Sequence, residues 1–499
     1  MQAQPVFVLP AGIVRFGANN QPWYAQEKHA GERMKTDLLG RLREGGRLTR
    51  PEQVQLIIHL SLPAIMAQLS HIVMQYIDAS MVGRLGAEAS ASIGLMASST
   101  WLFNGMCQAI VAGFTVQVAQ RIGAGQEKIA RRIQNQAFVY TVGFAVVLAA
   151  AGALISRALP VWLGGGDAIT ANATWYFLIY ALSLPFVQLN NIAGGMLQAS
   201  GNMRVPSILH VLMCGLDVVF NLLLIFPEST VLGVRIPGAG LGVAGAALGT
   251  ALSQVVVAVL MVLFLFVRSP MLHLRKGERL AFDMEHLRRG LRIGVPLGVE
   301  RVIMSGAQVM VTRIVAPLGT IAIAANSFGV TAESLCYMPG YGIASAAATL
   351  IGQSIGAGRR DMARRLGVLT TALGMLVMTA SGMLMYAFAP FMIGVMSPDP
   401  AVVALGARVL RIEAFAEPLF AASIVAAGVF RGAGDTLVPS LFNFITMWGV
   451  RLPIAALLAP RIGLVGVWVA MFCDLTSGGV LFLIRLRGSK WLKAHERLR

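Results

Sequence analysis

The sequence predicts an all-α polytopic membrane protein, with about twelve transmembrane helices in two pseudo-symmetric six-helix lobes. Three observations predict this fold class: the composition, the series of long apolar runs, and an internal repeat at a fixed offset. Of the 499 residues, 56% are hydrophobic and only 13% are charged, and the mean hydropathy is +0.70. A soluble core of this length cannot bury so much apolar surface, so the bilayer must act as the solvent.

The apolar runs are each long enough to cross about 30 Å of hydrocarbon as a helix. The first group lies at 56–77, 91–118, 137–155, 175–197, 208–226 and 241–267. The second group lies at 293–316, 321–351, 366–392, 401–429, 441–458 and 464–484. We therefore expect a disordered N-terminal tail at 1–50, an N-lobe at 51–268, an inter-lobe loop at 269–288, a C-lobe at 289–487 and a basic tail at 488–499.

The formal net charge of +17 does not indicate nucleic-acid binding, because the basic residues do not form one patch. They lie instead in alternate loops and in the C-terminal tail. By the positive-inside rule, both termini and the central loop are expected in the cytoplasm of a bacterium, with the spans in its inner membrane. We expect a monomer whose partners are the lipid bilayer and small organic substrates.

The sequence lacks the usual signals of a metal site or an enzyme. The four cysteines are scattered through apolar spans without CxxC spacing, and no HExxH pair occurs. The two QxIGAG segments, at 120–125 and 353–358, lack the lysine and Ser/Thr of a phosphate-binding loop. We therefore expect tight cytoplasmic turns there, no ATP hydrolysis, no enzymatic activity and no cofactor.

The repeat has an offset of 233 residues. Segment 120–132 matches 353–365, and the same offset pairs Pro63 with Pro296, Gly86 with Gly319, and Gly201 with Gly434. A repeat with an even number of spans returns the chain to its starting side, so the lobes share one orientation, and the substrate path is expected between them. The first copy has extra residues at 227–237, which we predict to form an external hairpin.

Several of these stretches also resemble a known family. They are MQYIDASMVGRLG at 74–86, the two QxIGAG loops, ESLCYMPG at 333–340 and RGAGDT at 431–436. Together they resemble the multidrug and toxic compound extrusion family, of the multidrug/oligosaccharidyl-lipid/polysaccharide flippase superfamily. The resemblance covers about residues 50–487. It implies two six-helix lobes, a V-shaped central cavity, and export of organic cations coupled to Na⁺ or H⁺.

An ionised group at the centre of a bilayer costs about 3 kcal/mol, so buried acids are functional candidates. In the N-lobe we expect Asp78 and Asp217 to form a cation-coupling cluster that takes a proton or Na⁺, with Na⁺ held by Asp78, Asp217 and Asn221. Asp217 and Asn221 are four residues apart and share a helix face. The alternative is that Asp78 pairs with Arg84 near the external interface. The full candidate set is Asp78, Asn190, Asn191, Asp217, Asn221 and Thr250.

In the C-lobe, the sequence also offers candidate functional residues, but it does not assign one role to each of them. Many family members carry an acid eight residues after the seventh-helix proline, where this chain has Met304, and the nearest acid is Glu300, one turn earlier. Glu300 is expected either in the substrate cavity or in an ion pair with Arg313 or Arg451. For Glu333 and Glu417 there are two alternatives: each acid either packs between helices as a polar group or contacts the substrate. The candidate set is Glu300, Glu333, Glu417, Arg313, Tyr337 and Met304.

These observations predict a secondary transporter that exchanges H⁺ or Na⁺ for cationic or amphipathic organic compounds by alternating access. Aromatic rings and thioethers suit an adaptable cavity for such cargo. The alternative is a lipid-linked oligosaccharide flippase of the same superfamily, which would favour a cationic cavity for pyrophosphate.

Overall fold

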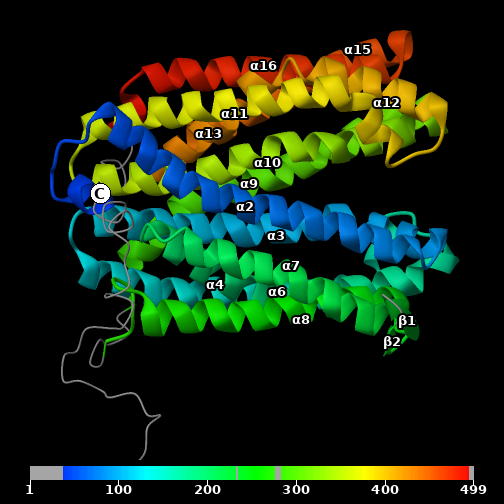
Figure 1. Ribbon diagram of the computed structural model, residues 1–499, viewed down its shortest axis with the longest axis horizontal. Helices are drawn as coiled ribbons and strands as arrows, with labels where there is room; N and C mark the ends of the chain where they lie inside the picture. Colours follow the sequence, from blue (N-terminus) through cyan, green and yellow to red (C-terminus); the bar gives the residue numbers. More distant parts are fainter. Residues whose placement is uncertain (1–37, 232–233, 276–281, 494–499) are drawn as a thin grey trace, which may run out of the picture.

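The computed structural model describes residues 38–231, 234–275 and 282–493 of the chain. Its long helices run side by side in two bundles (Figure 1). The N-lobe contains α2 Arg50–Gly83, α3 Ala87–Gly123, α4 Glu127–Ile155, the short α5 Leu159–Trp162, α6 Asp167–Ala199, α7 Arg204–Ile225 and α8 Gly242–Leu263, which continues as a π-helical turn, η2 Phe264–Arg268.

The C-lobe follows in the same order. It contains α9 Met284–Val315, a 3-10 turn η3 Ala316–Leu318, α10 Thr320–Gly356, α11 Arg360–Gly394, α12 Pro400–Glu413, α13 Glu417–Ala433, α14 Leu437–Thr446, a π-helical turn η4 Met447–Arg451, α15 Leu452–Ile462 and α16 Leu464–Arg487. The predicted hairpin is confirmed, since β1 Glu228–Val231 pairs antiparallel with β2 Val234–Pro237, with Glu228 opposite Pro237.

The described residues contain nine helices that are long and apolar enough to cross a membrane, and the bent pair α12 and α13 adds a tenth. The helices α9 and α10 have 32 and 37 residues and are also long enough to cross a membrane, but they are more polar or more charged than those nine. With these two the number of span-length elements agrees with the prediction. The run at 401–429 is not one straight helix, because it bends by 60° before α13, where Pro418 stands in the first turn.

The repeat predicted from the sequence is visible in the backbone. Left-handed glycines recur at the offset of 233: Gly86 and Gly319 have φ of 111° and 94°, and Gly201 and Gly434 have φ of 94° and 82°. These positions end or begin corresponding helices, where only glycine adopts such a φ at low cost. The two lobes are therefore built by the same sequence of turns.

Both described chain ends lie at one end of the bundle, which we call the terminal end (Figure 1). Here α3 of the N-lobe crosses α10 of the C-lobe. A Cβ on Gly123 would overlap the Gln353 carbonyl, and a Cβ on Gly356 would overlap the Gln120 carbonyl. The QxIGAG segments therefore do more than turn the chain, because their glycines allow the two lobes to touch.

The same segments are linked by side chains. Gln120 Nε2 donates to the Gly432 carbonyl at 3.1 Å, and Gln353 Nε2 donates to the Ala199 carbonyl at 2.7 Å. The two bonds are related by the repeat, and each runs from one lobe to the other. The two lobes are therefore in direct contact at the terminal end.

Residues 38–49 differ from the expected disordered tail. Residues 38–43 are helical, and Leu38, Leu39, Leu42 and Leu48 are buried in a core cluster formed largely by α10, α11, α13 and α16. The physical reason is that Leu38, Leu39 and Leu42 of the short helix and Leu48 after it bury apolar area against this cluster. The expectation for residues 1–37 lies outside the described residues.

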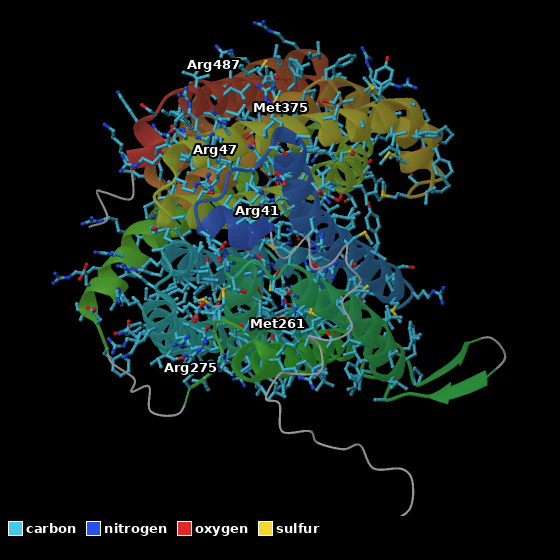
Figure 2. All side chains as sticks on the ribbon, turned by 60° about the vertical axis from the view of Figure 1, so that its left-hand side comes forward. Arg41, Arg47, Met261, Arg275, Met375 and Arg487 are labelled. Atoms are coloured by element: carbon cyan, nitrogen blue, oxygen red, sulfur yellow. The ribbon has the colours of Figure 1, made fainter. Side chains whose placement is uncertain are left out.

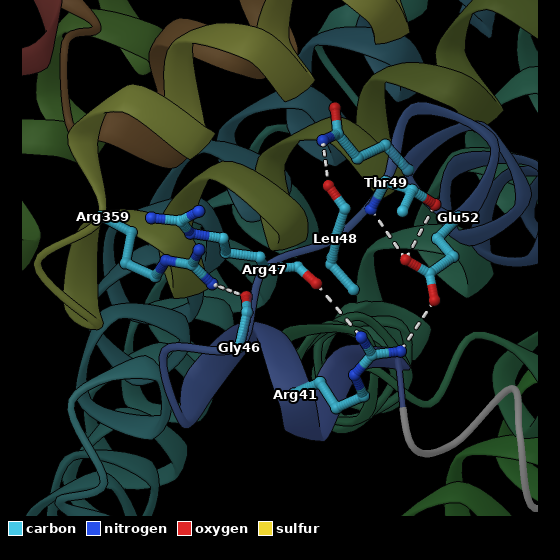
Figure 3. A network of polar contacts seen from close by, with 8 residues as sticks. Arg41, Gly46, Arg47, Leu48, Thr49, Glu52 and Arg359 are labelled. Atoms are coloured by element: carbon cyan, nitrogen blue, oxygen red, sulfur yellow. Dashed lines mark hydrogen bonds and ion pairs between the residues drawn. The ribbon is translucent and has the colours of Figure 1, made fainter.

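The N-terminal segment, residues 38–49, is also fixed by polar contacts (Figure 3). Arg41 bonds Glu52 at 2.8 Å, and Thr49 forms a capping box with Glu52 at the start of α2. Arg359, in the α10–α11 turn, donates to the carbonyls of Leu42 and Gly46. Figure 2 shows Arg41 of this segment on the blue helix where the two bundles meet.

The C-terminal boundary also differs from the expectation of a tail at 488–499. Trp491 is fully buried and its ring lies 5.8 Å from that of Phe430. The chain therefore continues to pack against the C-lobe after α16, and only residues 494–499 of the expected tail lie outside the described part.

Candidate functional site

Two carboxylates meet inside the N-lobe, as predicted. Asn221 Nδ2 donates to Asp78 Oδ1 at 2.8 Å and to Asp217 Oδ2 at 3.0 Å. Asp217 and Asn221 are completely buried, and Asp78 is half-buried. Asp78 comes from α2 and the other two come from successive turns of α7, so the packing of α2 against α7 creates the site. We call these three residues the N-lobe carboxylate site.

Besides α2 and α7, the helices α8 and α6 also border the N-lobe carboxylate site. Ser253 Oγ lies 3.5 Å from Asp217 Oδ1, and Tyr176 of α6 lies within electrostatic range of both carboxylates. Asn221 Oδ1 is buried without a hydrogen-bond partner in the described structure. It lies directly against Gly249, where a Cβ would overlap it. Gly249 therefore provides the space that the Asn221 side chain occupies.

Gly249→Ala is expected to destabilise the folded protein by about 1.5–3 kcal/mol, since displacing Asn221 removes a hydrogen bond to each acid, and bonds to charged groups are worth about that much. The measurement is thermal unfolding of the protein in detergent. Gly215→Ala is the matched control, because Gly215 also lies within a helix and a methyl group added there would meet no atom of another side chain or segment within 4 Å. Equal losses in both variants would contradict this role of Gly249.

Among the described residues, no hydrogen bond joins the other predicted N-lobe residues to the two carboxylates. Asn190 Nδ2 donates to Gln254 Oε1 at 3.1 Å, and Asn191 Nδ2 has no hydrogen-bond partner in the described structure. Thr250 contributes its carbonyl, which accepts from Ser253. The alternative pairing of Asp78 with Arg84 is wrong, because Asp78 bonds Asn221 while Arg84 is exposed at the end of α2.

Glu300 lies between the lobes. Its carboxylate accepts from Ser440 Oγ and from Asn443 Nδ2, both on α14. The predicted pairing with Arg313 is wrong, because Arg313 is exposed further along α9. Glu300 lines an enclosed pocket of about 60 Å³ between α3, α9 and α13, together with Arg301, Arg431 and Asp435. The pocket holds both charge signs and is the size of a few waters.

A second group of acids lies inside the C-lobe. Glu333 of α10, Glu413 at the end of α12 and Glu417 at the start of α13 are buried, and they interact electrostatically with one another. Arg451 lies among them and forms an ion pair with Asp474 of α16 at 3.8 Å, so its predicted pairing with Glu300 is also wrong. We call these five residues, the four acids and Arg451, the C-lobe charge cluster. None of the four oxygens of Glu413 and Glu417 has a hydrogen-bond partner within the described structure.

Tyr337 and Met304 are placed differently from each other. The Tyr337 ring lies 5.6 Å from that of Phe420 and 5.9 Å from that of Tyr341. These rings pack with Met375 and Met378 in one cluster beside the C-lobe charge cluster. Met304 packs instead against a different core cluster, which is formed by residues of α9, α10, α11, α12, α15 and α16. Aromatic rings and thioethers therefore pack together around Tyr337, and Met304 is not among them.

Sequence reasoning missed Glu413 and Asp474. Both are acids within or beside apolar runs, which is the signal used for Asp78 and would have found them. It also missed Gly249 and Ser253, which carry no signal in a single sequence. The residues at an offset of 233 from Asp78, Asp217 and Asn221 are Val311, Val450 and Ile454. The two lobes therefore share a backbone but carry different acidic sites.

Comparison with known proteins agrees with this architecture. The family model MatE matches the chain twice, at residues 63–223 and 296–457, and the two matches begin 233 residues apart, which is the repeat offset. The chain is 27% identical over 447 residues to "Probable multidrug resistance protein NorM" of Thermotoga maritima, covering 89% of this chain and 94% of that protein. It is 27% identical to "Uncharacterized transporter YisQ" of Bacillus subtilis, covering 83% and 90%.

Solved structures show the same fold. A MOP superfamily transporter from Pyrococcus furiosus, whose title describes a reversed polarity of its binding pocket, superimposes with a TM-score of 0.81 at 19% identity, covering 90% of this chain and 96% of that one. A mutant of the Vibrio cholerae MATE transporter VcmN gives 0.80 at 18% identity, covering 90% and 97%. Because the family model matches more than half of the chain, the protein belongs to the MatE family of membrane transporters.

Proposed function

We propose that this transporter exports small cationic or amphipathic organic compounds in exchange for protons. The proposal rests mainly on the N-lobe carboxylate site, where two acids on different membrane spans, α2 and α7, share one amide donor. Neighbouring carboxylates in a desolvated site cannot both ionise cheaply, so taking up a proton relieves their repulsion. The name of the Thermotoga maritima relative supports multidrug compounds as cargo.

A proton is favoured over Na⁺ by the orientation of Asn221. Its amide nitrogen, a donor, faces both acids, whereas an Na⁺ ion needs oxygen ligands. Binding Na⁺ would require the Asn221 carbonyl to turn toward the carboxylates. The described residues contain no group of three or more His, Cys, Asp or Glu side chains arranged to hold a metal ion.

The energy for export comes from the ion gradient. A proton supplies about 1.4 kcal/mol per unit of pH difference and about 2.3 kcal/mol per 100 mV. Exchange of one proton for one monovalent cation moves no net charge, so only the pH term remains. Ethidium export from proteoliposomes is expected to respond to an imposed pH gradient and not to an Na⁺ gradient. A response to the Na⁺ gradient alone would show that Na⁺, and not H⁺, is the coupling ion. A response to neither gradient would refute ion-coupled export.

Alternating access requires the contacts at the terminal end to break. We place this end on the cytoplasmic side, because the basic loops lie there. Arg43 of the N-terminal segment bonds both lobes: its guanidinium donates to Gln353 Oε1 at 3.0 Å and to the Ser200 carbonyl at 3.0 Å. Burial lowers the pKa of Arg43 to about 10, partly opposed by Glu127, so it stays charged at neutral pH.

Arg43→Ala is therefore expected to loosen the terminal end. Hydrogen exchange of the segments around residues 42–48 and 354–359 should become faster by about tenfold or more, since charged hydrogen bonds are worth about 1.5–3 kcal/mol each. Arg47→Ala is the matched control, since Arg47 lies in the same segment and its side chain is exposed. Unchanged exchange in Arg43→Ala would show that Arg43 does not hold the lobes together.

The aromatic cluster around Tyr337 supports cationic cargo. Ring faces attract organic cations, and the flexible thioethers of Met375 and Met378 adapt to ligands of different shape. The C-lobe charge cluster lies beside it and places four acidic side chains around one arginine, so carboxyl oxygens are available to a cation that binds there. We propose that a cationic substrate binds on this side of the path between the lobes.

A further inference from the structure

Each acid of the N-lobe carboxylate site has a histidine two helical turns before it. His71 precedes Asp78 on α2, and His210 precedes Asp217 on α7, in both cases by seven residues. Seven residues are about two turns of a helix, so each histidine lies on the same helix face as its acid. At the repeat offset of 233 from the two histidines, the C-lobe has a methionine and an asparagine. The histidines therefore accompany the acids and not the repeat.

Two hydrogen bonds fix how α2 and α7 lie along each other. Nearer the terminal end, Ser207 Oγ donates to the Pro63 carbonyl at 2.6 Å, and further along the helices Asn221 donates to Asp78 at 2.8 Å. The bonded residues are 144 and 143 positions apart in the sequence. The two helices therefore run parallel in a nearly constant register, which gives each side chain at their interface a defined level.

In this register, four titratable side chains form a series that leads away from the terminal end. The series is His210, His71, Asp217 and Asp78. Successive members are about 4–7 Å apart along the axis at 1.5 Å per residue. The electrostatic interactions agree, since His210 lies within range of His71, and His71 lies within range of Asp217. Both histidines are half-buried. They extend the N-lobe carboxylate site by two imidazoles toward the terminal end.

The imidazole side chain has the chemistry that a proton relay needs. It takes up and gives up a proton near neutral pH, and it has two ring nitrogens, so it can receive a proton on one and release it from the other. Cys214 of α7 and Tyr176 of α6 also lie within electrostatic range of both carboxylates. A thiol and a phenol keep their protons at neutral pH. The two histidines are therefore better suited than these groups to pass a proton on.

We propose that His71 and His210 carry the proton from the N-lobe carboxylate site toward the cytoplasmic side. Asp217 loses the proton and becomes a carboxylate, and His71 takes it and becomes an imidazolium. His71 returns to the neutral ring as His210 takes the proton, and water removes it from His210 once the terminal end opens. One bridging water is enough for each step. The relay rests on the proposed exchange of protons for cargo, and it keeps the proton within the N-lobe.

The test separates net proton movement from substrate exchange. In proteoliposomes, His71→Gln is expected to slow pH-driven ethidium export by about a hundredfold, the lower end of what a positioned proton-transfer group contributes. Exchange of radiolabelled for unlabelled ethidium at equal pH needs no net proton transfer, so its rate should be unchanged. Export at the normal rate would overturn the relay. An equal loss of exchange would also overturn it, because His71 would then only support the structure.

The matched control is His59→Gln. His59 lies on α2 twelve residues before His71. At about 100° per residue it is about 120° away from His71 around the helix axis, outside the face that carries the series. Its replacement should leave export and exchange unchanged. A loss of export as large as that of His71→Gln would overturn the assignment of the relay to this face.

A double variant tests whether the two histidines act in one series. His210→Gln alone should also slow export, and combining it with His71→Gln should slow export no further than His71→Gln alone, because the route is already broken. Losses that multiply would show two independent roles and would overturn the relay. If the unmodified protein does not respond to a pH gradient, the proposed function fails together with the relay. A normal response in both the unmodified protein and His71→Gln refutes the relay only.

Discussion

Asp78→Asn and Asp217→Asn are each expected to reduce pH-driven ethidium export to the level of vesicles that contain no protein. Each substitution keeps the size of the side chain but removes one of the two carboxylates that Asn221 connects. Without the second carboxylate the remaining acid no longer repels a neighbour, and the site loses the group that takes up and releases the proton. The measurement is export from proteoliposomes at a fixed pH gradient.

The control for this experiment is Asp167→Asn in the same lobe. Asp167 is exposed in the first turn of α6, away from the spans that form the N-lobe carboxylate site. Its replacement should leave export unchanged. Substrate binding without a gradient should persist in Asp78→Asn if the cargo binds on the C-lobe side. Full export by either Asp78→Asn or Asp217→Asn would refute the coupling role of the site.

Arg451→Met is expected to destabilise the folded protein by about 3–5 kcal/mol, the cost of leaving a buried ion pair without one partner. The Arg451 and Asp474 side chains are 13% and 8% exposed, so water screens the pair only weakly. Arg451 also offsets the charge of Glu333 and Glu413, which makes it the single positive group described within the C-lobe charge cluster. The measurement is thermal unfolding in detergent, followed by size-exclusion chromatography.

Two further variants test the reason for this loss. Arg313→Met removes an arginine from the exposed surface of the same lobe and should change stability little. Adding Asp474→Asn to Arg451→Met should recover part of the lost stability, because it removes the carboxylate left without a partner. If the double variant is as unstable as Arg451→Met alone, the ion pair is not the source of the effect.

Two parts of the N-lobe prediction show how far a single sequence leads. Asp217 and Asn221 could be placed together because their spacing of four residues fixes a shared helix face. Asp78 could be included because a carboxylate within a span is expensive. Asn190, Asn191 and Thr250 satisfied the same criterion of polarity within a span, yet their side chains form no hydrogen bond with either carboxylate in the described structure, since the rotation of α6 and α8 about their axes depends on packing.

In the C-lobe, by contrast, the contacts between the acids could not be predicted from the sequence. The bend between α12 and α13 places Glu413 and Glu417 at facing helix ends, where they meet Glu333 and Arg451. An apolar run at 401–429 gives no sign of such a bend except for Pro418. The pairing of Glu300 with Ser440 and Asn443 likewise joins residues about 140 positions apart, and no local pattern connects them.

The sequence by itself determined the membrane environment, the spans, the hairpin and the two-lobed repeat, because hydropathy, glycine positions and a fixed offset are properties of the chain read along its length. The tertiary structure alone decided which acids meet, that the QxIGAG glycines bring α3 against α10, and that residues 38–49 connect the lobes. These contacts depend on helix rotation and on close approach between distant segments, and their free energy comes from packing in three dimensions rather than from any local preference.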